Sequence, residues 1–184
     1  DNCDDCNNMS GDTNDDMTVD ILDIVTVVNI ILNGGMNSSS YTECELADAN
    51  YNSDSTINVL DIIQIINHIL GSNRLDSALT GHSDVFLTPQ DDDLVIAFDS
   101  DIPMTGIQIS FNSDYLLDIH INDSSSDIHS AVGIYEGVET FVVFSLDNNP
   151  FDENLEILIE GGHYLSPGDL EIILSSESGT SVSV

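Results

Sequence analysis

The chain has 184 residues and carries 34 Asp and Glu side chains against a single Lys or Arg, which gives a formal net charge of −33. Such a surface repels phosphate backbones and anionic lipid headgroups, so the charge excludes nucleic acids and anionic membranes as partners. No apolar run approaches the roughly 18 residues of a membrane span, so we expect no membrane insertion. The natural counter-charge is a metal cation.

Apolar residues make up 41% of the chain and charged residues only 19%, which is typical of a folded protein rather than a highly charged disordered one. The chain starts at Asp1, with neither Met nor a basic leader. This start suggests a processed product or a fragment from which an export signal has been removed. We therefore expect an extracellular or cell-surface protein.

Three cysteines lie in the first quarter of the chain, and two of them form a CxxC pair, Cys3 and Cys6. A redox motif would need a βαβ setting, and a zinc site would need a fourth ligand near Cys44; the sequence offers neither. We predict a structural disulfide between Cys44 and either Cys3 or Cys6. An odd number of cysteines leaves one thiol free or paired with an outside partner.

An internal repeat organises the first 71 residues. A shift of 38 residues places residues 12–23 on residues 50–61, and the match continues from residues 24–32 to residues 62–70. Each copy is an oxygen-rich loop followed by an apolar helix that stops at a glycine.

Each loop offers oxygen atoms at a spacing that suits calcium. Ca²⁺ takes about six to eight oxygens, and a twelve-residue loop wraps it with side chains at its first, third, fifth, ninth and twelfth places and a carbonyl at its seventh. The first loop offers Asp12, Asn14, Asp16, the Thr18 carbonyl, Asp20 and Asp23. The second loop offers Asn50, Asn52, Asp54, the Thr56 carbonyl, Asn58 and Asp61. We predict two Ca²⁺ ions, with the first loop binding more tightly because it has more carboxylates.

Neither loop has the glycine that the sixth place favours. Met17 and Ser55 occupy these places, at a cost of about 1 kcal/mol wherever φ is positive. The alternative is a pair of Asx-turns that only cap two helices, since Asp and Asn are also good N-caps. Two loops in register, each followed by the same helix pattern, favour calcium.

The doubled loop-helix unit resembles the dockerin family, the duplicated calcium modules of cellulosome-type and related exported proteins. The resemblance covers residues 10–71 and rests on the ligand spacing, on the Leu-Asp pairs at 22–23 and 60–61, and on the Asn-x-Ile-Leu endings. The run Cys-Glu-Leu-Ala-Asp-Ala-Asn at residues 44–50 looks like dockerin-type repeats of marine bacterial surface proteins. Asn50 departs from the family, where Asp is usual.

Both helices are apolar nearly all round. Two short helices can hide only part of such a surface from water. The rest should meet another domain or another chain. The alternative cover is the loop at residues 35–42, but it is mostly Gly, Asn and Ser and looks solvated.

After residue 74 the period changes to short or alternating apolar runs separated by turn clusters. We predict strands near residues 85–87, 94–98, 106–111, 116–121, 132–135, 141–146, 155–159, 170–174 and 182–184. Their spacing favours an antiparallel β-sandwich or jelly roll, and residues 104–117 loosely resemble a cohesin-like sandwich. The expected fold class is therefore α+β in two domains, a small all-α dockerin-like module at 1–74 and a cohesin-like β-sandwich at 75–184.

No nucleophile-elbow, zinc-protease or phosphate-loop motif occurs, so we expect no enzyme. Three Asn-x-Ser triplets are candidate glycosylation sites in a compartment that attaches glycans, namely Asn8, Asn37 and Asn122.

In the families that the chain resembles, one module type docks on the other. We expect a calcium-stabilised extracellular assembly protein that self-associates head-to-tail as a filament subunit, or that binds another β-sandwich protein. The alternatives are a terminal anchoring or adhesion fragment of a larger secreted enzyme or surface protein, and a carbohydrate-binding module that binds a glycan.

Overall fold

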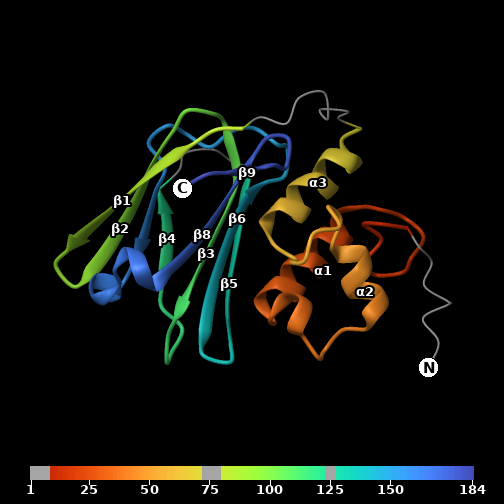
Figure 1. Cartoon of the computed structure of the whole chain (residues 1–184), viewed down its shortest axis with the longest axis horizontal. Coiled ribbons are helices and arrows are strands. Elements are labelled where there is room, and N and C mark those ends of the chain that lie inside the picture. The colour runs from red at the N-terminus through yellow and green to blue at the C-terminus, as the bar shows by residue number, and fades with distance from the viewer. Residues whose placement is uncertain (1–8, 72–79, 123–126) are drawn as a thin grey trace.

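The computed structural model describes residues 9–71, 80–122 and 127–184. Three α-helices come first, α1 (Ile21–Leu32), α2 (Glu43–Ala49) and α3 (Val59–Ile69). Nine strands follow: β1 (Ser83–Gln90), β2 (Asp93–Ser100), β3 (Met104–Asn112), β4 (Ile119–Asn122), β5 (Ile128–Tyr135), β6 (Val138–Ser145), β7 (Glu156–Ile159), β8 (Leu170–Ser176) and β9 (Ser181–Val182). The short 3-10 helices are η2 (Gly35–Asn37), η4 (Gly162–Tyr164) and η5 (Pro167–Asp169). The chain is thus a β-sandwich with a small helical part (Figure 1).

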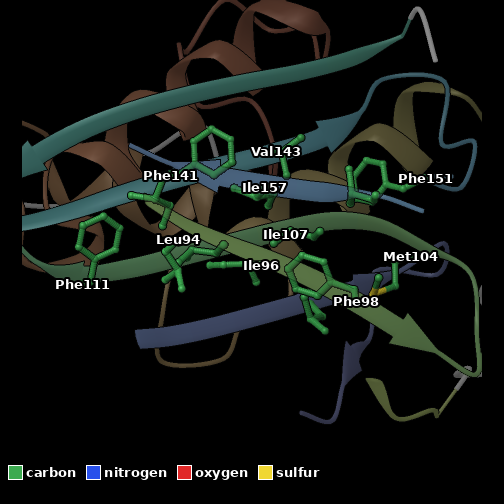
Figure 2. Packing of buried hydrophobic residues seen from close by; sticks show 14 of the residues in the cluster. Leu94, Ile96, Phe98, Met104, Ile107, Phe111, Phe141, Val143, Phe151 and Ile157 are labelled. Carbon is green, nitrogen blue, oxygen red and sulfur yellow. The ribbon is translucent and has the colours of Figure 1, made fainter. Parts of the chain in front are cut away.

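The sandwich has two antiparallel sheets. The four-stranded sheet has the order β1-β2-β7-β4, and the five-stranded sheet has the order β5-β6-β3-β8-β9. Inward-facing side chains of both sheets, such as Leu94 and Ile96 on β2 and Ile107 on β3, fill the space between them (Figure 2). This alternation of buried and exposed residues is the pattern that predicted the strands.

The helical part packs on the outer face of the five-stranded sheet. Val142 and Phe144 of β6 point away from the sandwich core and share one hydrophobic cluster with Ile62, Ile63 and the other buried residues of α1 and α3. Figure 1 shows the three helices together beside this sheet, on the side away from β1 and β2. Part of the apolar helix surface that the sequence left uncovered is therefore covered by the chain's own sheet, and Tyr41 of the 35–42 loop also packs against it.

Local signals set the ends of the helices. Gly34 and Gly71 follow α1 and α3 with φ of +100° and +63°, the left-handed conformation expected of the glycine stops. The sequence analysis missed α2, although Thr42 and Glu45 form a capping box at its start.

None of the helices in the described ranges is both long and apolar enough to cross a membrane. The boundary predicted between residues 74 and 75 lies outside the described residues, so the division into two domains stays a prediction.

Candidate calcium loops and docking surface

Asp23 closes the first loop onto the start of α1. Its carboxylate is buried and accepts the backbone N–H groups of Thr13 (2.8 Å), Asn14 (3.2 Å) and Asp20 (2.8 Å). Asp20 is in turn the N-cap of α1, because its Oδ1 accepts the N–H of Leu22 at 2.7 Å. The carboxylate at the twelfth place therefore ties both ends of the loop together.

Asp12 orders the middle of the same loop. Its buried carboxylate accepts the N–H of Asp16 at 3.1 Å and the N–H of Met17 at 2.9 Å. The Oδ1 of Asn14 also accepts the Asp16 N–H, at 2.9 Å. Asp16 accepts the N–H and the hydroxyl of Thr18, and this hydroxyl is the main reason why the pKa of Asp16 lies below its ordinary value. The predicted ligand side chains of Asp12, Asn14 and Asp16 thus accept hydrogen bonds from the backbone of the same loop.

The backbone at the sixth place differs between the two loops. Met17 has a φ of +74°, in the left-handed region that favours glycine, so the strain considered for this place applies to it. Ser55 does not adopt a positive φ. In the second loop the positive φ is at Ser53, in the fourth place, with +57°, and its counterpart Asp15 has +59°.

Asp61 holds the second loop as Asp23 holds the first. It is buried and accepts the N–H groups of Asn52 (3.1 Å) and Asn58 (2.9 Å). Asn58 caps α3 by accepting the N–H of Leu60 at 2.8 Å. Burial raises the pKa of Asp61 to about 6, against the lowering effect of these backbone hydrogen bonds.

Asn50, at the first place of the second loop, has an orphaned oxygen. Its Nδ2 donates to the Asp54 carbonyl at 2.9 Å, but its Oδ1 is buried and has no hydrogen-bond partner. Asp54 donates its N–H to Asn52 Oδ1 (2.9 Å) and accepts the N–H of Thr56 (2.6 Å). A buried polar atom without a partner is costly. A cation that prefers oxygen ligands would satisfy Asn50 Oδ1, so this donor set fits Ca²⁺.

Acidic side chains alone do not form a metal centre in the described ranges, where no three His, Cys, Asp or Glu side chains converge on one point. Calcium in these loops would depend on mixed carboxylate, amide and carbonyl oxygens. Asp48 of α2 was not among the predicted ligands, and no ligand spacing pointed to it. It is buried, and burial, with the charges of Asp15 and Asp12, raises its pKa to about 6.

Both α1 and α3 pack on the sandwich. Polar contacts fix the C-terminal half of α3. Gln64 Nε2 donates to the Gly179 carbonyl and Asn67 Nδ2 donates to the Glu177 carbonyl, both at 2.9 Å. Asn148 Nδ2 donates to Asn67 Oδ1 (2.9 Å) and to the same Glu177 carbonyl (2.8 Å). These bonds connect the helix to the β8–β9 turn and to the segment after β6.

Close packing fixes the N-terminal half of α3. A Cβ added to Gly106 of β3 would lie 2.7 Å from Val59 Cγ2 and 3.1 Å from Ile63 Cγ1, so the helix touches the sheet where a side chain is missing. The Val59 N–H also donates to Gln108 Oε1 of β3, at 3.2 Å. Gly106 therefore permits the close approach of helix and sheet.

The repeat relates the docked face of α3 to a free face of α1. The 38-residue shift gives the pairs Ile21 and Val59, Leu22 and Leu60, Val25 and Ile63, Thr26 and Gln64, and Asn29 and Asn67. On α3 the apolar members are buried, whereas Ile21, Leu22 and Val25 are 45%, 55% and 53% exposed. We call Ile21, Leu22, Val25 and Asn29 the α1 face. Exposed apolar patches are typical of protein interaction sites.

The remaining predicted residues are the three cysteines and the three glycosylation candidates. Asn37 and Asn122 are exposed, as glycosylation acceptors must be. Three residues lie outside the described ranges: Cys3, Cys6 and Asn8. The pairing of Cys44 with Cys3 or Cys6 therefore stays a prediction.

No protein-family model matches the chain, and no curated protein matches it. Among solved structures, the chain is similar to a non-cellulosomal cohesin from the hyperthermophilic archaeon Archaeoglobus fulgidus. The identity is 11%, the match covers 55% of this chain and 85% of that chain, and the TM-score is 0.33. A likeness at this level carries no argument about function.

Proposed function

We propose that this chain is a non-enzymatic extracellular assembly or adhesion protein, in which two Ca²⁺ ions order the helical part and the α1 face binds a protein partner. The observation that carries the proposal is the repeat itself. One copy docks Val59 and Ile63 on a β-sheet and buries Leu60, and the other copy exposes the equivalent residues. Two equivalent surfaces on one small unit favour two docking events.

The partner that fits the α1 face is the outer face of an antiparallel β-sheet. The equivalent face of α3 packs on such a sheet against Gly106, and the Glu177 carbonyl of the β8–β9 turn accepts from Asn67. Asn29 occupies the place of Asn67 on the α1 face and is exposed, so it can donate in the same way. The chain's own five-stranded sheet already contacts α3, so the partner is a separate β-sandwich protein.

Calcium supports this function by holding the start of each helix. The capping residues Asp20 and Asn58 and the buried carboxylates Asp23 and Asp61 are predicted ligands, and they also fix the first turns that carry the docking residues. A bound Ca²⁺ would supply the positive charge that offsets the crowded carboxylates of each loop. Loss of the ion should therefore loosen α1 and α3 together.

A head-to-tail filament is the second candidate. The contact between α3 and the five-stranded sheet forms within one chain. The same contact can form between chains if the helical part of one subunit docks on the sandwich of the next. Light scattering across a concentration series in millimolar CaCl₂ tests this candidate. A growing mass favours the filament, and a constant monomer mass excludes it.

Site-specific photo-crosslinking tests the α1 face. A photoreactive amino acid at Val25 of the full chain, incubated with the secreted proteins of the source cells in CaCl₂, should crosslink to a sheet strand of a β-sandwich protein. The same probe at Leu116, an exposed apolar residue between β3 and β4, is the matched control. The proposal fails if Val25 yields no crosslink beyond those of Leu116, or if calcium chelation leaves the crosslink unchanged.

A further inference from the structure

β1 is an edge strand of the sandwich, on the side away from the helices (Figure 1). One of its sides pairs with β2 along its whole length. On its other side, the described ranges show one bridge, in which Ser183 runs parallel to His82. The N–H of Ser83 donates to the Ser183 carbonyl at 2.8 Å, and the N–H of Ser183 donates to the Gly81 carbonyl at 3.0 Å. The chain after β9 therefore enters beside β1 in the parallel direction and sets the geometry for a further strand.

The backbone of β1 continues this open ladder. In an antiparallel pair, alternate residues direct their N–H and C=O groups to the partner strand and away from it. Because Ser83 directs its N–H away from β2, Val85 and Leu87 do the same. Pro89 is the next residue of β1 whose backbone faces away from β2. It carries no N–H, so the row of outward-facing donors ends there.

A groove of about 400 Å³ accompanies this open edge. Its apolar walls come from both sheets, with Val85 and Leu87 on β1 and Leu170 and Ile172 on β8. These four side chains are partly buried against the sandwich core, so the groove is a gap between the two sheets and not a flat surface.

One polar atom of the groove lacks a partner. Ser83 lines the groove, its side chain is buried, and its Oγ has no hydrogen-bond partner. A buried hydroxyl of this kind is normally satisfied by protein or by ordered water. The groove therefore combines apolar walls, an unsatisfied hydroxyl and a row of backbone groups that face outward.

We propose that this groove binds an extended segment of a protein partner, which adds to the sandwich as a strand parallel to β1 and in line with β9. The segment places apolar side chains at alternate positions between Leu87 and Leu170, and its backbone pairs with Val85 and Leu87. Between these positions it carries neutral or basic residues, because the exposed Asp84 borders the groove and the whole chain has a net charge of −33. Strand addition of this type takes its affinity from the main chain and its specificity from alternate side chains.

The site is independent of the proposed function. It lies on the sandwich, and none of its lining residues belongs to the calcium loops or to the α1 face. Its failure would leave the calcium loops untouched, and loss of calcium binding would leave the groove untouched.

A synthetic peptide tests the proposal. The probe is the labelled peptide Lys-Val-Lys-Val-Thr-Val, and the control has the same composition with its three valines adjacent. Fluorescence anisotropy with the full chain should show saturable binding of the alternating peptide, at least tenfold tighter than binding of the control. Equal affinity of the two peptides, or no binding of either, overturns the proposal.

A pair of variants then tests the geometry. Leu87→Pro removes the outward N–H and the side chain, whereas Leu87→Ala removes only the side chain and keeps the N–H. Since the Leu87 N–H points away from β2, neither variant loses a hydrogen bond of the β1–β2 ladder. Leu87→Pro should bind the peptide about tenfold more weakly than Leu87→Ala, as expected for one lost main-chain hydrogen bond.

A modified peptide covers the case in which Leu87→Pro does not fold. N-methylation of the alternating peptide at the amides that face β1 should weaken binding to the wild-type chain by about tenfold, for the same reason. Unchanged affinity of the N-methylated peptide contradicts strand addition. A monomer–dimer equilibrium that the peptide does not compete with, but that Leu87→Pro abolishes, would assign the edge to a second copy and also overturn the proposal.

Discussion

Replacing Gly106 with alanine should weaken the packing of α3 on β3 and so lower the stability of the folded chain. The new Cβ would lie 2.7 Å from Val59 Cγ2, well inside the roughly 3.5–4.0 Å of an ordinary carbon–carbon contact. Overpacking of this kind costs about 1–3 kcal/mol. Because alanine has less freedom than glycine in the unfolded chain, it returns about 0.5–1 kcal/mol. We therefore expect Gly106→Ala to lower the free energy of unfolding by roughly 1 kcal/mol, within a range of about 0–2.5 kcal/mol.

A second substitution distinguishes this contact from a general loss of stability. Val59→Ala alone leaves a small cavity and should cost roughly 2 kcal/mol. In the double variant the methyl group of Ala at position 106 occupies the space that Val59 vacates, so the two losses should not add. We expect the double variant to be more stable than the sum predicts by about 1–2 kcal/mol, within the range found for residues in contact.

Urea unfolding followed by far-ultraviolet circular dichroism, in saturating CaCl₂, measures all four proteins of this cycle. Gly168→Ala is the matched control, because a Cβ there has no atom within 4 Å, and it should change stability by less than about 0.5 kcal/mol. Additive losses in the double variant would refute the reasoning, since they would mean that α3 does not touch β3 at this position.

Three further predictions concern the carboxylates. Asp23→Ala should lose more stability in CaCl₂ than Asp61→Ala, because the first loop has more carboxylate ligands; equal losses in thermal unfolding would overturn this order. Burial raises the pKa of Glu139 above its ordinary 4.5, and the hydrogen bond from the Leu117 N–H offsets this rise only in part. Folding therefore favours the protonated carboxyl, and the stability of the folded chain falls as the pH rises above about 4.5. Glu139→Gln should therefore gain stability relative to wild type in urea unfolding as the pH rises above about 4.5, and a constant difference would contradict this. A calcium chelator should reduce the helical circular dichroism signal, because unneutralised carboxylates repel one another in both loops; an unchanged signal would refute the claim.

The strands were predictable because alternation is a local property. All nine predicted runs correspond to strands, in order, although the run at 116–121 begins earlier than β4 does. The docking of the helices was not predictable in this way, because it depends on residues distant in sequence. One signal was present: residues 141–144 are Phe-Val-Val-Phe, and a continuous apolar run indicates a strand buried on both faces. Gly106 could not be interpreted without its neighbour Val59.

The loops were predictable in composition but not in all details. Repeat spacing identified the residues that hold each loop, including Asp23 and Asp61, because short loops bring neighbours in sequence together. The sequence did not predict that the backbone differs at the sixth place of the two loops, where Met17 has a positive φ and Ser55 does not. The buried Asp48 was missed because it reaches the first loop from α2, outside the repeat.

Calorimetric titration of the full chain with CaCl₂ is the most direct test of the central claim, that the duplicated loops bind calcium and thereby hold the docking helices. We predict two bound ions for each chain, with the tighter one lost in Asp23→Ala and the weaker one lost in Asp61→Ala. Absence of calcium binding by the wild-type chain, or binding that survives both substitutions together, would contradict the account.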